Sequence, residues 1–235
     1  MDDTKETDKI KKRYERRKSL PEKKIYSYFN PGTLFIVQER QRKIFSLLKK
    51  HGVDNLENRI ILDVGCGSGE WLRDFIQWGA TPENLYGIDL LKERIEIARK
   101  ISPNANFYCT NAEKIDFAGN FFDTVIVSTC FTSILDTDMK KRIAQEISRV
   151  LKDNGVILWY DFRYNNPWNP DVKGIEKKEI KGLFGDCDYD FNLVTLAPPV
   201  SRHLAPISFM ACEVLSKIPF LKTHYLAIIK KKQIK

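Results

Sequence analysis

The sequence predicts an α/β fold built on a doubly wound, mostly parallel β-sheet. Between residues 56 and 162, five short apolar runs alternate with segments whose apolar residues recur at helical spacing. This alternation is typical of β-α-β units. The first run, RIILDV at 59–64, is nearly continuous in apolar residues, as expected for a central strand buried on both faces. After residue 174 the chain adds two further strand-like runs.

The elements are assigned in chain order. A helix precedes the first strand and ends near Gly52, and its expected inner face holds Ile36, Phe45, Leu47 and Leu48. The predicted strands share β-branched and aromatic residues, and they are 59–64, 84–89, 104–111, 121–129, 156–162, 188–196 and 224–230. The later predicted helices share apolar residues at three- and four-residue spacing, and they are 69–78, 91–101, 136–151, 175–183 and 203–217. KDNG at 152–155 reads as a turn.

The basic charge of the chain lies at its two ends. Residues 1–24 hold ten Lys and Arg against six Asp and Glu, and 230–235 hold four lysines, so these ends account for the whole net charge of +8. We expect residues 1–24 to be disordered or a loosely docked tail that is helical only when docked, and 231–235 to be a second tail. Charge on tails, rather than on a folded face, disfavours a nucleic-acid partner.

Cysteine usage predicts neither disulfides nor a metal site. The five cysteines are odd in number, widely spaced and without a C-x-x-C pair. No His/Asp/Glu cluster has metal-ligand spacing, so we expect no metal. With no signal peptide and no long apolar run in the sequence, these features indicate a cytoplasmic protein. The most apolar stretch, 206–221, is broken by charges, which favours a packed amphipathic helix over contact with a membrane surface.

The loop after the first strand, DVGCGSG at 63–69, predicts a ligand site. Ligands of such sheets bind beyond the carboxyl ends of the strands, and glycine permits positive φ and close approach to bare backbone. The dinucleotide pattern G-x-G-x-x-G fails because Glu70 stands in its sixth place after Gly65 and Gly67. Asp63, just before the loop, suits a ligand with a cationic amino group better than a pyrophosphate.

Asp89 supplies a second carboxylate at the end of the second strand, twenty residues beyond Gly69. A carboxylate at this place can bind a ribose diol. The alternative is that Asp89 caps the helix at 91–101. The glycine loop upstream favours ribose binding.

The combination of ILDVGCGSG (61–69), GID (87–89) and RVLKDNG (149–155) resembles the class I S-adenosylmethionine-dependent methyltransferases over residues 55–162. The resemblance implies a Rossmann-like, doubly wound sheet of seven strands, mostly parallel, with an antiparallel last strand. It also implies S-adenosylmethionine as cofactor and S-adenosylhomocysteine as product. The positions that it assigns to the cofactor, from its methionine half through the ribose and adenine to the donor-methyl side, are Asp63, Gly65, Cys66, Gly67, Asp89, Leu90, Asn111, Ala112, Ser128 and Thr129.

The resemblance also implies how one domain, 25–230, is organised. Residues 25–55 form an N-terminal helical lid, 56–162 the cofactor-binding core, and 163–230 the acceptor-side loop and last strands. Over the whole chain the pattern resembles a branch of these methyltransferases associated with bacterial surface-glycan assembly. Its marks are YSYFNPG (26–32), FTSILD (131–136), WYDFRYNNPWNPDVKGI (159–175), TLAPPVSRHLAP (195–206) and THYLAIIK (223–230).

The expected acceptor wall is the loop within 159–175. A hydroxyl acceptor profits from a general base, whereas a carboxylate or thiolate needs none. The candidate catalytic residues are Asp161, Arg163 and His203, with His224 as a further candidate base. Tyr26, Tyr28 and Phe29 could cover the cofactor or simply pack in the core.

The leading function is therefore O-methylation of a small-molecule or sugar/glycan acceptor. Two alternatives stay open. An RNA or protein methyltransferase that uses the basic tails would bind its partner with steep salt dependence. A non-catalytic module that only holds S-adenosylmethionine would be favoured by a blocked acceptor pocket. The sequence does not give the oligomeric state.

Overall fold

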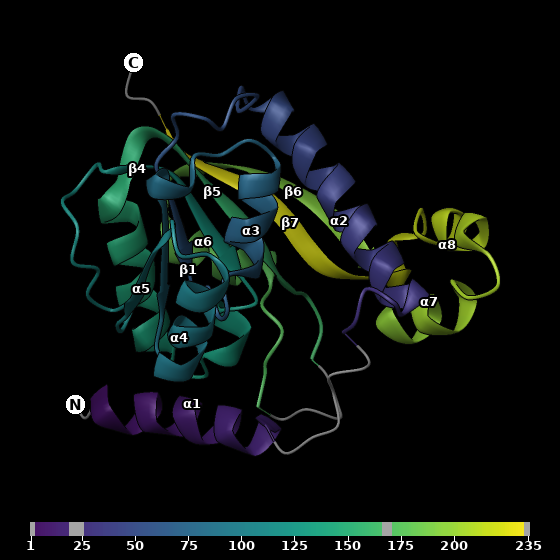
Figure 1. Ribbon diagram of the computed structural model, residues 1–235, viewed down its shortest axis with the longest axis horizontal. Coiled ribbons are helices and arrows are strands. Elements are labelled where there is room, and N and C mark those ends of the chain that lie inside the picture. The colour runs from purple at the N-terminus through teal and green to yellow at the C-terminus, as the bar shows by residue number, and fades with distance from the viewer. Residues whose placement is uncertain (1–2, 19–25, 166–170, 233–235) are drawn as a thin grey trace.

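The computed structural model describes residues 3–18, 26–165 and 171–232. Its centre is a seven-stranded sheet in the order β3-β2-β1-β4-β5-β7-β6 (Figure 1). The strands are β1 (Ile61–Val64), β2 (Leu85–Asp89), β3 (Asn106–Cys109), β4 (Phe122–Ser128), β5 (Leu151–Phe162), β6 (Cys187–Leu196) and β7 (Lys222–Lys231).

The pairing of the strands confirms the predicted sheet. β1 pairs in parallel with β2 and β4, β2 with β3, and β4 with β5. β7 lies antiparallel between β5 and β6. Val64 pairs with Ile88 on one side and Val127 on the other, so the carboxyl ends of three neighbouring strands meet at one edge of the sheet.

Helices cover both faces of the sheet. They are α1 (Asp3–Lys18), α2 (Pro31–Lys50), α3 (Glu70–Gln77), α4 (Lys92–Ile101), α5 (Thr137–Val150), α6 (Lys177–Phe184), α7 (Pro198–Leu204) and α8 (Phe209–Leu215). Side chains of α2, α3 and α4 form one core layer with the sheet, and those of α5 and α6 form the other (Figure 1). α7 and α8 stand beyond the sheet, beside the N-terminal end of α2.

The apolar runs that predicted the strands form the core. Leu62, Val125 and Trp159 are fully buried, and burial of each such side chain contributes on the order of 2 kcal/mol. Short polar side chains start three of the helices. Asn30 accepts hydrogen bonds from the first amides of α2, Asp136 accepts one from Met139 N of α5, and Ser208 accepts one from Ala211 N of α8.

The structure corrects three details of the predicted elements. The helix predicted at 203–217 is two short helices, α7 and α8, and Pro206, which has no amide hydrogen to donate, lies between them. Phe45 of α2 is half exposed against Trp78, while Ile44 fills the core. KDNG at 152–155 continues β5 instead of turning, with a register shift opposite β4. Within the described ranges, the helices are too short or too polar to cross a membrane.

Candidate cofactor and acceptor site

The loop between β1 and α3 is held against the end of β2. The amides of Gly65 and Cys66 both donate to Ile88 O, at 2.8 and 3.0 Å. Gly65 and Gly67 have φ of +76° and +55°, a region that other residues enter only with strain. A Cβ on Gly65 would also lie 3.0 Å from Cys130 Sγ. The glycines therefore fix the shape of the loop and leave its backbone bare.

Asp89 joins this loop to the start of α4. Its Oδ2 accepts from Gly67 N and its Oδ1 from Leu91 N, each at 2.8 Å. The carboxylate thus joins the glycine loop to the turn after β2. It does not cap α4, whose N-cap is Leu91 without a side-chain hydrogen bond, and ribose binding stays a prediction. Each oxygen keeps a second lone pair for a ligand hydroxyl.

Asp63 is a buried carboxylate without a hydrogen-bond partner. It is 1% exposed, and neither of its oxygens is bonded within the described part of the chain. Burial, with smaller contributions from Asp89 and Glu70, raises its pKa to about 8. An unpaired buried carboxylate is costly, and a cationic group beside it would offset that cost. The site therefore fits a ligand with an amino group, as S-adenosylmethionine has.

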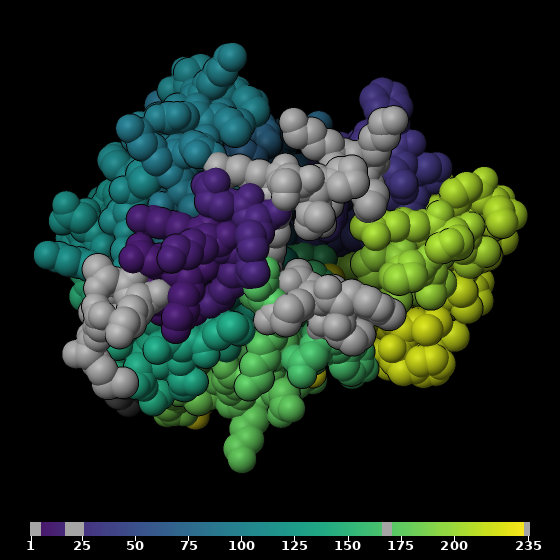
Figure 2. Space-filling model, turned by 90° about the horizontal axis from the view of Figure 1, so that it is seen from below, coloured from purple at the N-terminus to yellow at the C-terminus, as the bar shows by residue number. Residues whose placement is uncertain are grey.

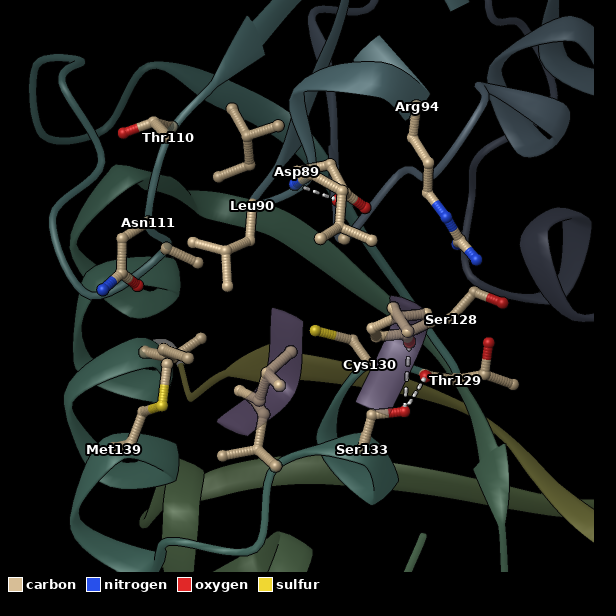
Figure 3. Close-up of a pocket in the computed structure, with 18 residues that line it drawn as sticks. Asp89, Leu90, Arg94, Thr110, Asn111, Ser128, Thr129, Cys130, Ser133 and Met139 are labelled. Atoms are coloured by element: carbon tan, nitrogen blue, oxygen red, sulfur yellow. Dashed lines mark hydrogen bonds between the residues drawn. The ribbon is translucent and has the colours of Figure 1, made fainter. Parts of the chain in front are cut away.

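A cavity of about 110 Å³ lies beyond Asp89, between the ends of β2, β3 and β4 (Figure 3). Leu90, Asn111 and Ala112 line it. The Asn111 side chain closes a turn, because Oδ1 accepts from Glu113 N at 3.1 Å and Nδ2 donates to Glu113 Oε2 at 2.8 Å. The walls combine apolar side chains with polar groups such as Asn111, Thr110 and Ser133, a lining that suits an adenine ring.

α1 closes this cavity from outside. Ile10 and Tyr14 line it, and Ile10 is 7% exposed. Arg13 donates to Ser133 O at 2.9 Å, and the Arg94 guanidinium lies 4.6 Å from the centre of the Tyr14 ring. Residues 3–18 are thus helical and docked, one of the states that the sequence left open. The apolar pair Ile10 and Tyr14, four residues apart in a charged segment, was the available signal.

Ser128 and Thr129, at the end of β4, line both this cavity and a larger pocket. Thr129 has a φ of +48°, which is unusual for a residue other than glycine. Its amide donates to Tyr160 O of β5 at 2.8 Å. This hydrogen bond therefore fixes the backbone bend after β4, at the place where the two pockets meet.

The larger pocket has a volume of about 760 Å³ and extends from the glycine loop to α7. Asp63, Gly65, Cys66 and Gly67 line its inner end. The remaining wall is rich in aromatic and cationic side chains. They include Tyr26, Tyr28, Arg40, Trp71, Tyr160 and Arg202. Phe29, the third residue expected in a cover, is 98% exposed and lines neither pocket.

Arg40 is a wall residue that the sequence did not reveal. It is buried, pairs with Asp74 at 3.6 Å, and lies 4.7 Å from the Trp71 ring centre and 5.5 Å from that of Tyr160. Ion pairing and stacking together hold the guanidinium rigidly. A lone arginine in the middle of a helix carries no sequence signal for this role.

His224 is the histidine that lines the pocket. Its ring stacks on Tyr160 with centres 4.5 Å apart. Thr223 Oγ1 donates to Thr195 O at 3.2 Å and lies 2.8 Å from His224 Nδ1. With the hydroxyl hydrogen directed at Thr195 O, Nδ1 would carry the proton of this contact and Nε2 would be left as an acceptor. Burial, and then Arg40, lower the pKa of His224 to about 3, so the ring is neutral near pH 7.

Asp161, Arg163 and His203, predicted to be catalytic, line neither pocket, so the geometry gives their catalytic roles no support and those roles stay predictions. His203 is exposed and its Nδ1 lies 2.7 Å from Pro199 O. Arg163 donates to Pro219 O at 3.2 Å. The Arg163 guanidinium, half-buried, also lies 4.3 Å from the ring centre of Tyr164 and 5.6 Å from that of Tyr225.

Asp161 is fully buried and bonded on both oxygens. Its Oδ1 accepts from Thr132 Oγ1 at 2.5 Å and from Phe162 N at 2.9 Å, and its Oδ2 accepts from Thr132 N at 3.2 Å. Burial raises its pKa to about 6. Asp161 therefore fixes the loop after β4 and is a positioning residue. Tyr164 and Asn165 of the expected acceptor loop do line the pocket, whereas Asn166 and Asn169 lie outside the described residues.

Comparisons with known proteins agree with this geometry. Residues 61–155 match a family described as a methyltransferase domain. Among curated relatives, the chain is 34% identical over 124 residues to an uncharacterised protein of Methanocaldococcus jannaschii, covering 53% of this chain and 43% of that one. It is 30% identical over 147 residues to human arsenite methyltransferase, covering 57% of this chain and 37% of that one. The matched segment thus spans less than half of either relative.

Solved structures share the fold. One of a SAM-dependent methyltransferase from Methanosarcina mazei has a TM-score of 0.56 at 20% identity, covering 75% of this chain and 94% of that one. Another, of the PH0226 protein from Pyrococcus horikoshii, has a TM-score of 0.59 at 16% identity, covering 93% and 99%. Residues 61–155 are therefore a methyltransferase domain, and the strand order and the solved structures show the fold of class I S-adenosylmethionine-dependent methyltransferases. The cofactor that this domain implies is S-adenosylmethionine.

Proposed function

We propose that this protein transfers a methyl group from S-adenosylmethionine to an oxygen of a small-molecule or glycan acceptor in the larger pocket. The observation that carries the proposal is that the two pockets are adjacent, because Gly65, Ser128 and Thr129 line both. A module that only held the cofactor would be expected to have its acceptor side blocked. A pocket of about 760 Å³ beside the glycine loop supports catalysis instead.

S-adenosylmethionine, when bound, supplies a methyl group on a positively charged sulfur, which is transferred by in-line displacement. The contribution of the chain is then mainly positioning. Asp63 and Asp89 would hold the two polar halves of the cofactor. Asp161 and Thr132 hold the loop after β4 that separates the cofactor cavity from the acceptor pocket.

The lining of the acceptor pocket suits a molecule with several oxygens. Tyr26 and Trp71 offer flat apolar faces, and Arg202 Nε is buried without a partner among the described residues. His224 Nε2 can accept a hydrogen bond from a hydroxyl. With a pKa of about 3, His224 is a weak base, and its proposed role is to orient a hydroxyl at the methyl donor. Aromatic faces combined with a few directed polar groups are typical of small-molecule sites.

The position of α1 disfavours an RNA or protein substrate. Part of the N-terminal basic segment is docked against the cofactor cavity through Arg13 and Tyr14, which gives it a role in the fold.

An activity screen tests the proposal. The protein is incubated with S-adenosylmethionine and sugar nucleotides, lipid-linked glycans, small hydroxy acids, RNA or protein, and release of S-adenosylhomocysteine is measured. We expect release with an oxygen-rich small molecule or glycan, insensitive to salt. Release only with RNA, falling steeply with salt, contradicts the proposal. Tight binding of S-adenosylhomocysteine without turnover of any acceptor favours the non-catalytic module.

A further inference from the structure

Large apolar side chains gather on the outer side of the unit formed by α7, α8 and the turn that follows them, here called the C-terminal cap (residues 198–221). Fourteen large apolar side chains are exposed in the described part of the chain, and five of them lie between 207 and 220. They are Ile207, Phe209, Met210, Val214 and Phe220. Such a concentration on a soluble domain marks an interaction surface.

The fold of α8 directs Met210 and Val214 outward, whereas Phe209 also packs inward. Cys212 is fully buried, and the Phe209 ring lies against Phe35 of α2 with centres 5.8 Å apart. Met210 and Val214, four residues apart, therefore share the opposite side of the helix. They are 78% and 58% exposed. In Figure 2 the yellow-green segment of the cap forms a lobe at the edge of the molecule.

A basic recess lies beside this apolar side. It has a volume of about 320 Å³ and includes Arg42, Lys43, Lys217 and Lys222 with Glu39 and Glu213. Glu213 is paired with Arg42. Lys43 and Lys217 have no ion-pair partner among the described residues. The recess therefore carries uncompensated positive charge.

We infer that the C-terminal cap docks on the surface of a membrane that contains anionic lipid. Apolar side chains on one side of a short helix, flanked by lysines, match an interface between acyl chains and negatively charged headgroups. The lysine stems can lie along apolar surface while their ammonium groups reach the headgroups. A protein partner would have to cover the same apolar side chains and also supply acidic groups to the recess.

Docking would bring the acceptor pocket to the membrane. Arg202 of α7 lines that pocket, and its guanidinium lies 5.7 Å from the ring centre of Tyr26, another lining residue. Residues of the cap thus form part of the pocket wall. If the proposed methyl transfer holds, the acceptor is an amphiphile whose polar part enters from the membrane surface. Docking itself does not depend on the reaction.

Vesicle co-sedimentation of the full chain tests the inference. The probes are vesicles of phosphatidylcholine alone and of phosphatidylcholine mixed with phosphatidylglycerol. We expect binding to the mixed vesicles that weakens with salt and is much weaker on phosphatidylcholine alone. The double variant Met210→Ser/Phe220→Ser should bind at least about tenfold more weakly, since two apolar side chains leave the interface. The matched control Ile97→Ser/Ile101→Ser, which changes exposed residues of α4, should bind like the parent.

A second pair of variants tests the charge. Lys43→Glu/Lys217→Glu should abolish binding to the mixed vesicles. The control Lys100→Glu/Lys178→Glu makes the same change in net charge at exposed positions elsewhere. It should keep most of the binding to the mixed vesicles. Unchanged binding of S-adenosylhomocysteine in all four variants shows that they fold, and so separates a failure of docking from a failure of the cofactor site. The inference would be overturned if the cap and control variants lost vesicle binding equally, or if the parent did not bind the mixed vesicles. A dimer that buries the cap would also overturn it.

Discussion

The amide of Gly67 donates to the carboxylate of Asp89 at 2.8 Å, so the acid at the end of β2 holds the glycine loop that follows β1. One residue therefore supports the loop and faces the cofactor cavity. The arrangement explains why two segments more than twenty residues apart form one site.

Asp89→Ala is expected to abolish binding of S-adenosylhomocysteine and to lower the stability by about 1–3 kcal/mol, because two amides lose their acceptor. Calorimetric titration and thermal unfolding measure the two effects. Asp138→Ala, at an exposed acid of α5, is the control and should keep the affinity. Unchanged affinity in the Asp89 variant would remove this acid from the site. Gly67→Val should also prevent binding, because its φ of +55° disfavours a branched side chain.

Asp63 makes the stability of the ligand-free protein depend on pH. Its pKa is 3.8 in the unfolded chain and about 8 in the folded protein, so the folded state holds the proton more tightly. The free energy of unfolding therefore falls as pH rises from about 4 to about 8. Asp63→Asn should match the parent below pH 4 and be more stable above pH 8, as thermal unfolding would measure. Asp161 contributes in the same direction but is present in both proteins. A stability difference that does not vary with pH would contradict the assignment.

The same carboxylate should couple cofactor binding to proton release. A cationic amino group beside Asp63 favours the ionised form, so affinity for S-adenosylhomocysteine should rise with pH up to about 8. Titrations in two buffers of different ionisation enthalpy measure the released proton. Asp63→Asn should bind weakly at every pH and release none. Proton release that persists in the variant would assign it to another group.

His224 and His203 provide a matched pair for the acceptor pocket. With the acceptor that the screen identifies, His224→Phe should lower kcat at least about tenfold while binding of S-adenosylhomocysteine is retained, because an orienting hydrogen bond is lost. His203→Ala should be fully active, since this ring is exposed outside the pocket. The opposite pattern would return His203 to the site. Because the pKa of His224 is about 3, its titration should not appear in the rate between pH 5 and 8.

α1 should contribute to cofactor affinity. Ile10→Ser removes an apolar wall of the cavity beyond Asp89 and is expected to weaken binding of S-adenosylhomocysteine by about tenfold. Lys12→Ala, on the exposed side of the same helix, is the control and should bind normally. Equal affinities of the two variants would show that α1 does not close the site when ligand is present.

Much of the fold could be predicted from the sequence because a strand buried on both faces and an amphipathic helix differ in residue pattern. RIILDV and FFDTVIVST predicted β1 and β4 to within about two residues. Turns were predicted less reliably from residue type. KDNG at 152–155 favours a turn locally, but pairing with neighbouring strands keeps it in β5.

The sequence by itself located the strand-end residues that are predicted to bind the cofactor, though not the docking of α1 beside them. The cofactor side of the site is built from consecutive residues at strand ends, and the sheet order brings the carboxyl ends of β1, β2 and β4 to one edge. Local spacing was therefore enough to locate Asp63, the glycine loop and Asp89.

Only the tertiary structure decided the acceptor side. Arg40 of α2, Tyr160 of β5 and His224 of β7 meet in one pocket although no motif connects them. Alternation along β5 turns Tyr160 toward α2 and its neighbour Asp161 toward the opposite layer, where Thr132 bonds it. Which side chain reaches the pocket depends on the face of the strand and on packing between distant segments, and neither can be read from residue type.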